Sequence, residues 1–218
     1  MTRRRILRAV ATALIAAGVL ALADGIATLA WKEPLTAVYA SVQQARLDDR
    51  LRALERAAPP TEVRRVVAQD GARRRRAAAA ALARRSDPGD PIGRLSIPAI
   101  GLRTVVVEGT DGGDLRLGPG HYADSALPGA RGTVAIAGHR TTYGAPFRRV
   151  DELEPGDRIE LRMPYGTFAY RVARTRIVAP TDLAAVARVA YDRLVLTACH
   201  PLFTANRRIA VYARPAFR

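Results

Sequence analysis

The chain has 218 residues and a formal net charge of +15, which is carried almost entirely by arginine because Lys32 is the only lysine. This length allows one domain of ordinary size together with accessory segments. Such a charge is compatible with three classes of partner, namely nucleic acid, a membrane surface and an anionic polymer. Aromatic residues make up only 6% of the chain, and no basic stripe is interleaved with them, so we expect no nucleic-acid binding.

The N-terminus combines a basic flank with a long apolar run. Four arginines lie within residues 1–8, and the apolar run covers residues 9–31. At about 1.5 Å per residue, this run is long enough to cross a bilayer as a helix. The positive-inside rule puts residues 1–8 in the cytoplasm and everything after Trp31 outside, with Trp31 as an aromatic anchor at the outer interface. We therefore predict a single-pass membrane protein.

Two features favour an alternative interpretation of this segment as a cleaved signal sequence. Asp24 interrupts the apolar run, and a charge at that depth is unfavourable by roughly 2.5–3.5 kcal/mol on insertion scales. The triplet Ala21-Leu22-Ala23 resembles a signal-peptidase site. A retained anchor and a cleaved signal both export the rest of the chain.

Residues 32–90 form a predicted helical stalk and linker. Their helical composition is broken at Pro59-Pro60 and resumes in an alanine-rich segment that holds four arginines at 73–76. We predict a solvated helical stalk; the alternative is that these arginines touch anionic lipid headgroups or wall polymer. A run dense in Pro, Gly and Asp at 86–91 marks the linker.

Residues 91–218 alternate short apolar runs with turns that contain Gly and Pro. Within 158–163 the apolar residues recur with the period of two expected of a half-buried strand, and the turn at 164–166 joins this strand to 167–178 in a long hairpin. The continuous apolar run in 193–199 suits a strand that is buried on both faces. Roughly six to eight short strands predict a mainly β fold that closes into a barrel.

The candidate chemistry lies in this last segment, which holds the single cysteine, Cys199, and all three histidines. His139 and Cys199 each end a predicted strand, so they can converge on one rim of a barrel, where functional residues commonly lie. An exported lone cysteine has no partner for an intrachain disulfide. It is therefore a reactive thiol, an intermolecular link or a small buried apolar residue.

Strand geometry selects the partners of Cys199. His200 is adjacent in sequence, but successive side chains on a strand point to opposite faces, which makes it a poor base. Arg208 begins a strand that can return antiparallel beside Cys199 and bring a guanidinium near the thiol. There its charge would stabilise a thiolate and then an oxyanion. Alternation along the strand allows only one of Arg207 and Arg208 to face this site.

These residues carry a resemblance. The segments "AIAGHRTTYGAPFRRVDELEPGD" and "LVLTACHPLFTANRRIAVYARP" resemble sortases, most closely the class E sortases of high-GC actinobacteria. The resemblance covers roughly residues 91–218 and implies an eight-stranded β-barrel, with His139, Cys199 and Arg208 as the catalytic residues. It also implies cleavage of a sorting signal of the LPxTG or LAxTG kind between Thr and Gly, followed by transfer of the acyl end to an amine of the cell-wall precursor or of a pilin.

The chain departs from the family pattern in one place. The family usually has Thr-Leu-x-Thr-Cys at the nucleophile, whereas here Ala198 precedes Cys199 and removes a hydroxyl that often lines the site. We take Ala198, together with His121, Thr141 and Tyr143, as candidate substrate-binding or supporting residues. The expected chemistry requires neither a metal nor another cofactor.

Two other interpretations remain open. An exported cell-wall cysteine hydrolase or peptidase would also use a cysteine and a histidine. In papain-like peptidases, however, the cysteine precedes the histidine in the chain, whereas here His139 precedes Cys199. The Ser-x-Gly-Cys-x-Arg pattern of L,D-transpeptidases is absent here. A non-catalytic, membrane-tethered scaffold would keep Cys199 as an inert core thiol. Reactivity of Cys199 toward a small alkylating reagent separates the enzyme from the scaffold.

Overall fold

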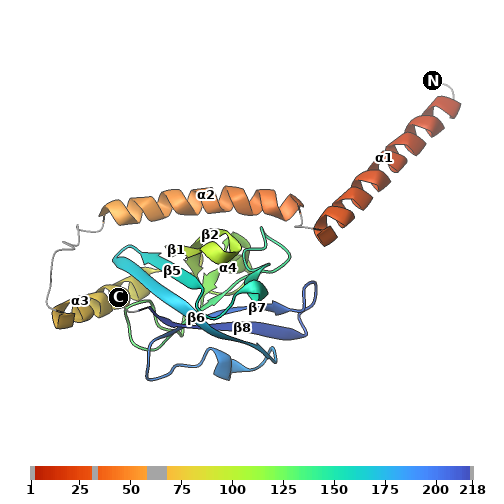
Figure 1. Ribbon diagram of the computed structural model, residues 1–218. Coiled ribbons are helices and arrows are strands. Elements are labelled where there is room, and N and C mark those ends of the chain that lie inside the picture. Colours follow the sequence, from red (N-terminus) through yellow and green to blue (C-terminus); the bar gives the residue numbers. More distant parts are fainter. Residues whose placement is uncertain (1–2, 31–33, 58–67, 217–218) are drawn as a thin grey trace.

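A computed structural model describes residues 3–30, 34–57 and 68–216. Three helices precede the strands: α1 (Arg3–Ala30), α2 (Pro34–Ala57) and α3 (Ala68–Arg85). Figure 1 shows α1 projecting away from the rest of the molecule, while α2 and α3 lie beside the strands. The predicted interfacial Trp31 and the predicted break at Pro59-Pro60 fall outside the described residues.

Eight strands close into a barrel with the order β1-β2-β3-β4-β7-β8-β6-β5. They are β1 (Pro91–Ile97), β2 (Leu102–Glu108), β3 (Gly120–His121), β4 (Thr133–Ala137), β5 (Arg158–Met163), β6 (Gly166–Val178), β7 (Arg193–His200) and β8 (Arg207–Pro215). The predicted eight-stranded barrel is therefore confirmed. The predicted β5–β6 hairpin is present, and β5 has the alternating burial that its sequence pattern indicates.

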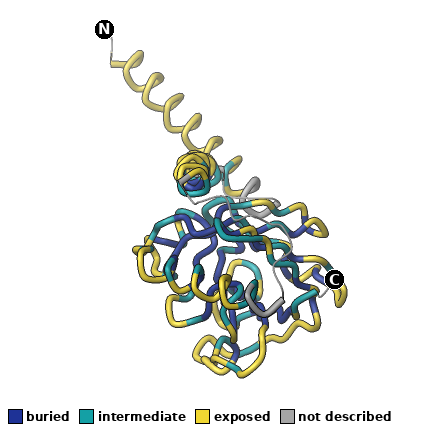
Figure 2. Tube along the Cα trace, turned by 90° about the vertical axis from the view of Figure 1, so that its left-hand side faces the viewer, coloured by how far each residue is buried: buried dark blue, intermediate teal, exposed yellow. Residues whose placement is uncertain are grey.

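The interior of the barrel is filled by alternate residues of the strands. On β7, Leu194, Leu196 and Ala198 belong to the main core, whereas Val195 packs on the outer face against Ala210, Tyr212 and Ala185. This alternation is the period of two that every strand imposes. In Figure 2 the buried, dark-blue trace runs through the strands, and exposed, yellow segments mark the loops. The side-chain direction on β7 decides which residues can meet at a surface site.

Short helices connect the strands: η1 (Pro98–Ile100), α4 (Gly112–Leu117), η2 (Val150–Glu152) and η3 (Leu183–Ala185). Helix α4 begins with a capping box, in which the Asp111 side chain accepts from the backbone N–H of Asp114, and the Asp114 side chain accepts from that of Asp111. This reciprocal arrangement satisfies two N–H groups that a helix start leaves without partners. The end of α4 brings Arg116 toward the loop that follows β4.

The prediction of a solvated stalk is wrong, because α2 and α3 both pack against the barrel. Leu47 and Leu51 of α2 are buried against Val105 and Val107 of β2, and α3 contributes Leu82 and an alanine to the main core. Burying a leucine side chain stabilises a fold by about 1.5–3 kcal/mol. The outer face of β2 would otherwise expose its valines to water, so helix and strand cover each other.

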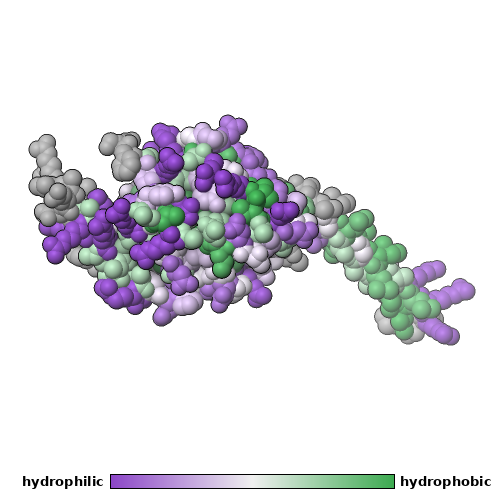
Figure 3. Space-filling model, turned by 90° about the horizontal axis from the view of Figure 1, so that it is seen from below, coloured by the Kyte–Doolittle hydropathy of each residue, from purple (hydrophilic) through white to green (hydrophobic). Residues whose placement is uncertain are grey.

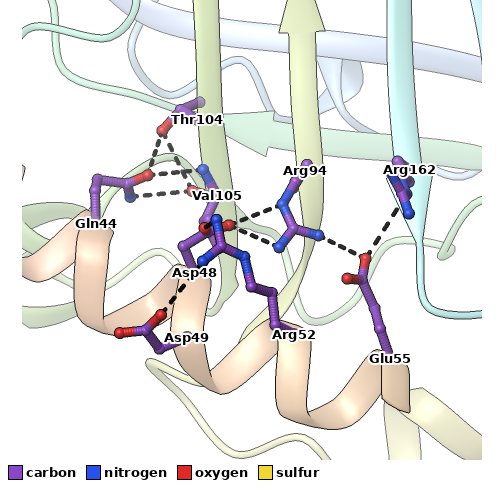
Figure 4. Close-up of polar contacts among 9 residues, drawn as sticks. All are labelled: Gln44, Asp48, Asp49, Arg52, Glu55, Arg94, Thr104, Val105 and Arg162. Carbon is purple, nitrogen blue, oxygen red and sulfur yellow. Dashed lines mark hydrogen bonds and ion pairs between the residues drawn. The ribbon is translucent and has the colours of Figure 1, made fainter.

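Polar contacts fix the position of α2 along the barrel (Figure 4). The Gln44 side-chain amide hydrogen-bonds to the backbone as a neighbouring strand would. Its Nε2 donates to the carbonyls of Val105 and Leu117 at 3.2 and 2.8 Å, and its Oε1 accepts from the Val105 N–H at 2.7 Å. The Arg94 guanidinium donates to the carboxylates of Asp48 at 2.6 Å and Glu55 at 2.5 Å. Such charge-assisted bonds are among the stronger hydrogen bonds in proteins.

The predicted apolar N-terminal segment forms α1, which is long and apolar enough over Arg3–Gly25 to cross a membrane. None of this span is buried within the protein. In Figure 3 it forms a green, hydrophobic rod whose outer end carries purple, hydrophilic side chains. A membrane anchor and a signal sequence both have these properties.

Candidate active site

Strands β4, β7 and β8 lie side by side and bring three distant segments together. Strands β4 and β7 are parallel and pair from Thr133 with Arg193 to Ala137 with Thr197. The ladder continues beyond the end of β4, because the Gly138 N–H donates to the Thr197 carbonyl at 3.0 Å. His139 and Cys199 each lie two residues beyond the last pair, so they occupy the same end of two adjacent strands.

Arg208 joins this pair from the other side of β7. Cys199 and Arg208 are directly opposite each other in the antiparallel β7–β8 pair, and His200 is opposite Arg207. Directly opposite residues on antiparallel strands share a face of the sheet, with Cα atoms about 4.5–5.5 Å apart. The register therefore puts Arg208 on the face of Cys199 and Arg207 on the other face.

The shared face is the outside of the barrel. Ala198 and Ile209 point into the core, and Thr197 points outward, where its hydroxyl lies 3.0 Å from the Tyr122 hydroxyl. Alternation then places Cys199 outside, where it is half-buried and has no disulfide partner. The segment that connects β6 and β7 forms one wall beside this face, because Ala185 packs against Val195. Thr197, Cys199 and Arg208 therefore share the outer face of β7 and β8.

Gly138 explains why a glycine precedes His139. A Cβ atom at position 138 would lie 2.5 Å from the ring of Phe147, which is fully buried in the core. Real side chains almost never approach so closely, so only glycine fits this inward-facing position. The His139 carbonyl accepts from the Phe147 N–H at 2.9 Å and fixes the start of the following loop. His139 is consequently directed outward and is half-buried.

The environment of His139 favours its neutral form. Burial lowers the pKa of the imidazole below its usual value of 6.5, and the positive charge of Arg116 lowers this pKa further. Both causes act against the imidazolium, since burial removes hydration and a like charge repels it. At neutral pH the ring is therefore mostly uncharged.

The charge of Arg208 is held in place by the chain itself. Its Nη1 donates to the carbonyls of Ala205 and Arg207 at 3.0 and 3.2 Å. Within the part of the chain that the structure describes, no carboxylate forms an ion pair with this guanidinium. Its charge is thus not neutralised by a carboxylate of the described residues.

Comparison with known proteins decides the family. The family described as "Sortase domain" matches residues 95–216, which cover the whole barrel except the first residues of β1. The chain belongs to the sortase family. Members of this family are cysteine transpeptidases, and the three residues that the resemblance carries over, His139, Cys199 and Arg208, lie together at one end of β4, β7 and β8.

Individual relatives cover the barrel. The chain is 37% identical to sortase D of Bacillus subtilis over 134 residues, which are 60% of this chain and 66% of the relative. It is 31% identical to sortase SrtE1 of Streptomyces coelicolor over 144 residues, covering 59% of this chain but 41% of the relative. The crystal structure of sortase E1 from Streptomyces coelicolor with a tripeptide in the active site aligns with a TM-score of 0.54 at 27% identity, covering 61% of this chain and 91% of that chain. These findings support the family; they do not single out class E.

One further residue beside Cys199 and His139 was missed by sequence reasoning. Arg140 is only 2% exposed, and its Nη2 is 2.6 Å from the Asp151 carboxylate. Its Nη1 is 3.4 Å from the Cys199 carbonyl and 3.3 Å from Nδ1 of His200. Arg140 thus ties the end of β7 to the loop after β4 from beneath the site. Because the sequence contains many arginines, nothing in it distinguished Arg140 from the others.

Two of the candidate substrate-binding residues lie elsewhere. Ala198 is buried in the barrel core, so its side chain faces away from Cys199 and its departure from the family pattern removes nothing from the outer face. His121 is 2% exposed: its Nδ1 lies 3.0 Å from the Glu108 carboxylate, and its Nε2 lies 3.1 Å from the Ala126 carbonyl and 2.9 Å from the Ser125 hydroxyl. Both ring nitrogens are engaged, which fits a structural role in the core.

Thr141 and Tyr143, the other two candidates, lie in the loop that follows His139 and are partly buried. The Tyr143 ring is tilted by 39° to the His139 ring, with the two centroids 5.3 Å apart. Among the residues that the structure describes, no group of three or more His, Cys, Asp or Glu could hold a metal ion. The site thus consists of a thiol, an imidazole and a guanidinium, with an aromatic ring beside the imidazole.

Proposed function

We propose that this chain is a membrane-anchored sortase that cleaves a sorting signal of the LPxTG or LAxTG kind between Thr and Gly and joins the acyl end to an amine. The amine belongs to the cell-wall precursor or to a pilin. The observation that carries the proposal is the register of three adjacent strands, in which Cys199 lies opposite Arg208 and at the same end as His139. The chain spans 66% of the Bacillus relative and 41% of the Streptomyces relative.

In the first half-reaction Cys199, as the thiolate, attacks the carbonyl carbon of the threonine. A C–S bond forms, and the carbonyl oxygen becomes an oxyanion. Arg208, on the same face, donates hydrogen bonds to this oxyanion or to the substrate backbone beside it. When the oxyanion collapses, the C–N bond to glycine breaks and leaves a thioacyl enzyme.

His139 supplies and removes the protons. It protonates the departing glycine amine, and in the second half-reaction it deprotonates the incoming amine that attacks the thioester. The first task needs the imidazolium, which the lowered pKa makes a minority form at neutral pH. The second task needs the neutral imidazole, which the same shift favours.

The outer face of β4, β7 and β8 supports a peptide substrate. The structure of the Streptomyces relative holds a tripeptide in its active site. In the present chain the face beside Cys199 is bounded by the β6–β7 segment and carries the half-buried Tyr122 side chain, whose hydroxyl lies 3.0 Å from the buried Thr197 hydroxyl. We assign the sorting signal to this face.

Helix α1 supports export and anchoring. Its arginine-rich start would remain in the cytoplasm, and the barrel would then lie outside the cell, where surface proteins with sorting signals and the cell-wall amine are found. The half-buried thiol of Cys199 has no disulfide partner to occupy it in that oxidising environment.

The deciding experiment incubates the full chain, in detergent micelles, with LPxTG and LAxTG peptides and an amine such as triglycine. We expect cleavage between Thr and Gly and a peptide–amine product, both lost in Cys199→Ala. Cleavage that persists in Cys199→Ala would refute the mechanism. A peptide acid as the sole product would indicate a hydrolase, and failure of Cys199 to react with iodoacetamide in the folded protein would favour a scaffold.

A further inference from the structure

The first turns of α2 reach the loop that carries the catalytic histidine. The Tyr143 backbone N–H donates to Oγ1 of Thr36 at 2.9 Å, across more than a hundred residues of sequence. The Tyr39 ring packs edge-on against the Tyr143 ring, with centroids 6.2 Å apart and planes at 70°. The Tyr143 ring also contacts the His139 ring, with centroids 5.3 Å apart. Helix α2 and His139 are thus joined through one aromatic side chain.

The loop adopts a conformation that its own sequence does not favour. Tyr143 and Ala145 have φ angles of 50° and 46°, in the left-handed region that residues with a Cβ rarely occupy. Contacts from elsewhere must hold such a backbone in place. Helix α2 supplies them, because a Cβ atom on Gly144 would lie only 3.2 Å from the Ala40 methyl group, and Ala40 and Ala145 are both buried.

Helix α2 is itself fixed to the barrel independently of this loop. Leu47 and Leu51 are buried against β2, Gln44 is bonded to the β2 backbone, and Arg94 of β1 holds the carboxylate of Asp48. Figure 4 shows the polar contacts of Gln44 and Asp48 with the strands. The N-terminal turns of α2 are therefore presented to the His139 loop by a rigid support.

We propose that Tyr143 is a positioning residue for His139 and that α2 holds Tyr143 in place through Tyr39 and Thr36. This inference rests on the proposed function of His139 as the proton carrier. It makes the helix that directly follows the apolar N-terminal segment a part of the active-site support.

Arg116, at the end of α4, completes the surroundings of Tyr143. Its guanidinium carbon is 5.8 Å from the centroid of the Tyr143 ring, close enough for a cation–π contact. The Tyr143 ring is therefore contacted by α2, by α4 and by the imidazole of His139. A ring held from several sides restricts the rotation of the histidine beside it.

The rate depends on the orientation of His139, because its imidazole must reach two amine nitrogens in turn, first that of the leaving amine and then that of the incoming one. Misplacement of a catalytic group by about 1 Å can cost on the order of a hundredfold in rate. Substrate binding on the outer face of β7 and β8 does not depend on this orientation. Loss of the support should therefore lower kcat and leave the KM for the peptide nearly unchanged.

The test uses the full chain in detergent micelles with the peptide and amine assay. For Tyr143→Ala we expect kcat to fall about tenfold or more, and for Tyr39→Ala about three- to tenfold, with KM within about twofold. Tyr143→Phe and Tyr39→Phe keep the rings and should restore kcat to within about twofold. Val38→Ala is the matched control, because Val38 neighbours Tyr39 on α2 and is 66% exposed.

Coupling gives a second criterion. If Tyr39 acts through Tyr143, then Tyr39→Ala should add little to the loss in a Tyr143→Ala background, whereas independent effects would multiply. A KM increase that accounts for the whole loss, or unchanged kcat in both alanine variants, would overturn the proposal. So would phenylalanine variants as inactive as the alanine variants.

A spectroscopic readout separates this inference from the proposed function. The chain has three histidines, so the imidazole signals of His139 can be assigned by comparison with His139→Gln. Tyr39→Ala should shift and broaden these signals, and Val38→Ala should not, even if no peptide is ever cleaved. Unchanged His139 signals in Tyr39→Ala would sink the positioning role, whereas absent cleavage by the unmodified chain would refute only the proposed function.

Discussion

Cys199 and Arg208 are directly opposite each other across strands β7 and β8, and both point away from the core of the barrel. The neighbouring pair, His200 and Arg207, points to the other face. The chain thus presents two consecutive arginines, of which one, Arg208, lies on the face of Cys199. This relationship gives the site a clear internal control.

Replacing each of these arginines in turn tests that relationship. Arg208→Ala should lower kcat for peptide cleavage by about a hundred- to a thousandfold, the usual loss when one donor to an oxyanion is removed. Arg207→Ala should change it by less than about twofold, because Arg207 is exposed and lies on the opposite face. Steady-state kinetics with the peptide measure both. Equal losses in the two variants would contradict the assignment of the faces.

The protonation of His139 gives a second test. We expect its pKa, followed by NMR, to lie below 6.5, because burial and the charge of Arg116 both disfavour the imidazolium. Arg116→Gln removes the smaller cause, so the pKa should rise but stay below 6.5. Arg103→Gln, a change at an exposed arginine of β2, serves as the control. A pKa that does not move in Arg116→Gln would contradict the electrostatic effect.

The same shift has a consequence for stability. Below pH 6.5 the unfolded chain takes up a proton at position 139 more readily than the folded chain, because the folded pKa is depressed. The free energy of unfolding should therefore fall as the pH drops below 6.5, and His139→Gln should reduce this dependence. Urea unfolding at pH 7.5 and at pH 5.5 measures the difference between the two proteins.

Gly138 gives a fourth test. A Cβ atom there would meet the Phe147 ring at 2.5 Å, so Gly138→Ala forces the core and the His139 loop apart. Overpacking of this kind costs about 1–3 kcal/mol of the free energy of unfolding, and the displaced histidine should also lower kcat. Gly113→Ala is the control, since a Cβ atom there meets nothing within 4 Å and α4 favours alanine. Equal stability of the two variants would refute the close approach.

Much of the barrel could be predicted from the sequence because strand periodicity is local. The alternation in β5 and the apolar run of β7 indicate their strands directly, and the same period of two separates His200 from Cys199. Applied once more, it would have excluded the Ala198 side chain, which is one residue from Cys199 and must face the core. That error came from the family pattern being weighed without the strand geometry.

Other features depend on contacts that a single sequence does not reveal. Strand β3 is only two residues long, and its pairing with β2 and β4 is set by its neighbours rather than by its own pattern. The burial of Arg140 depends on an ion pair with Asp151 and on the end of β7, and the end of β7 lies far from it along the chain. Whether α2 is solvated depends on Val105 and Val107 of β2, which supply the apolar surface that receives it.

The last prediction concerns the packing of α2 against the barrel. Leu51 is fully buried against β2, so Leu51→Ala should lower the free energy of unfolding by about 2–5 kcal/mol through lost contacts and the cavity that remains. Val42→Ala, on the same helix but 47% exposed, should change it by less than about 0.5 kcal/mol. Urea unfolding of the full chain in detergent, followed by circular dichroism, measures both. If α2 were a solvated stalk, the two variants would be equally stable, and the support that it gives to Tyr143 and His139 would have no physical basis.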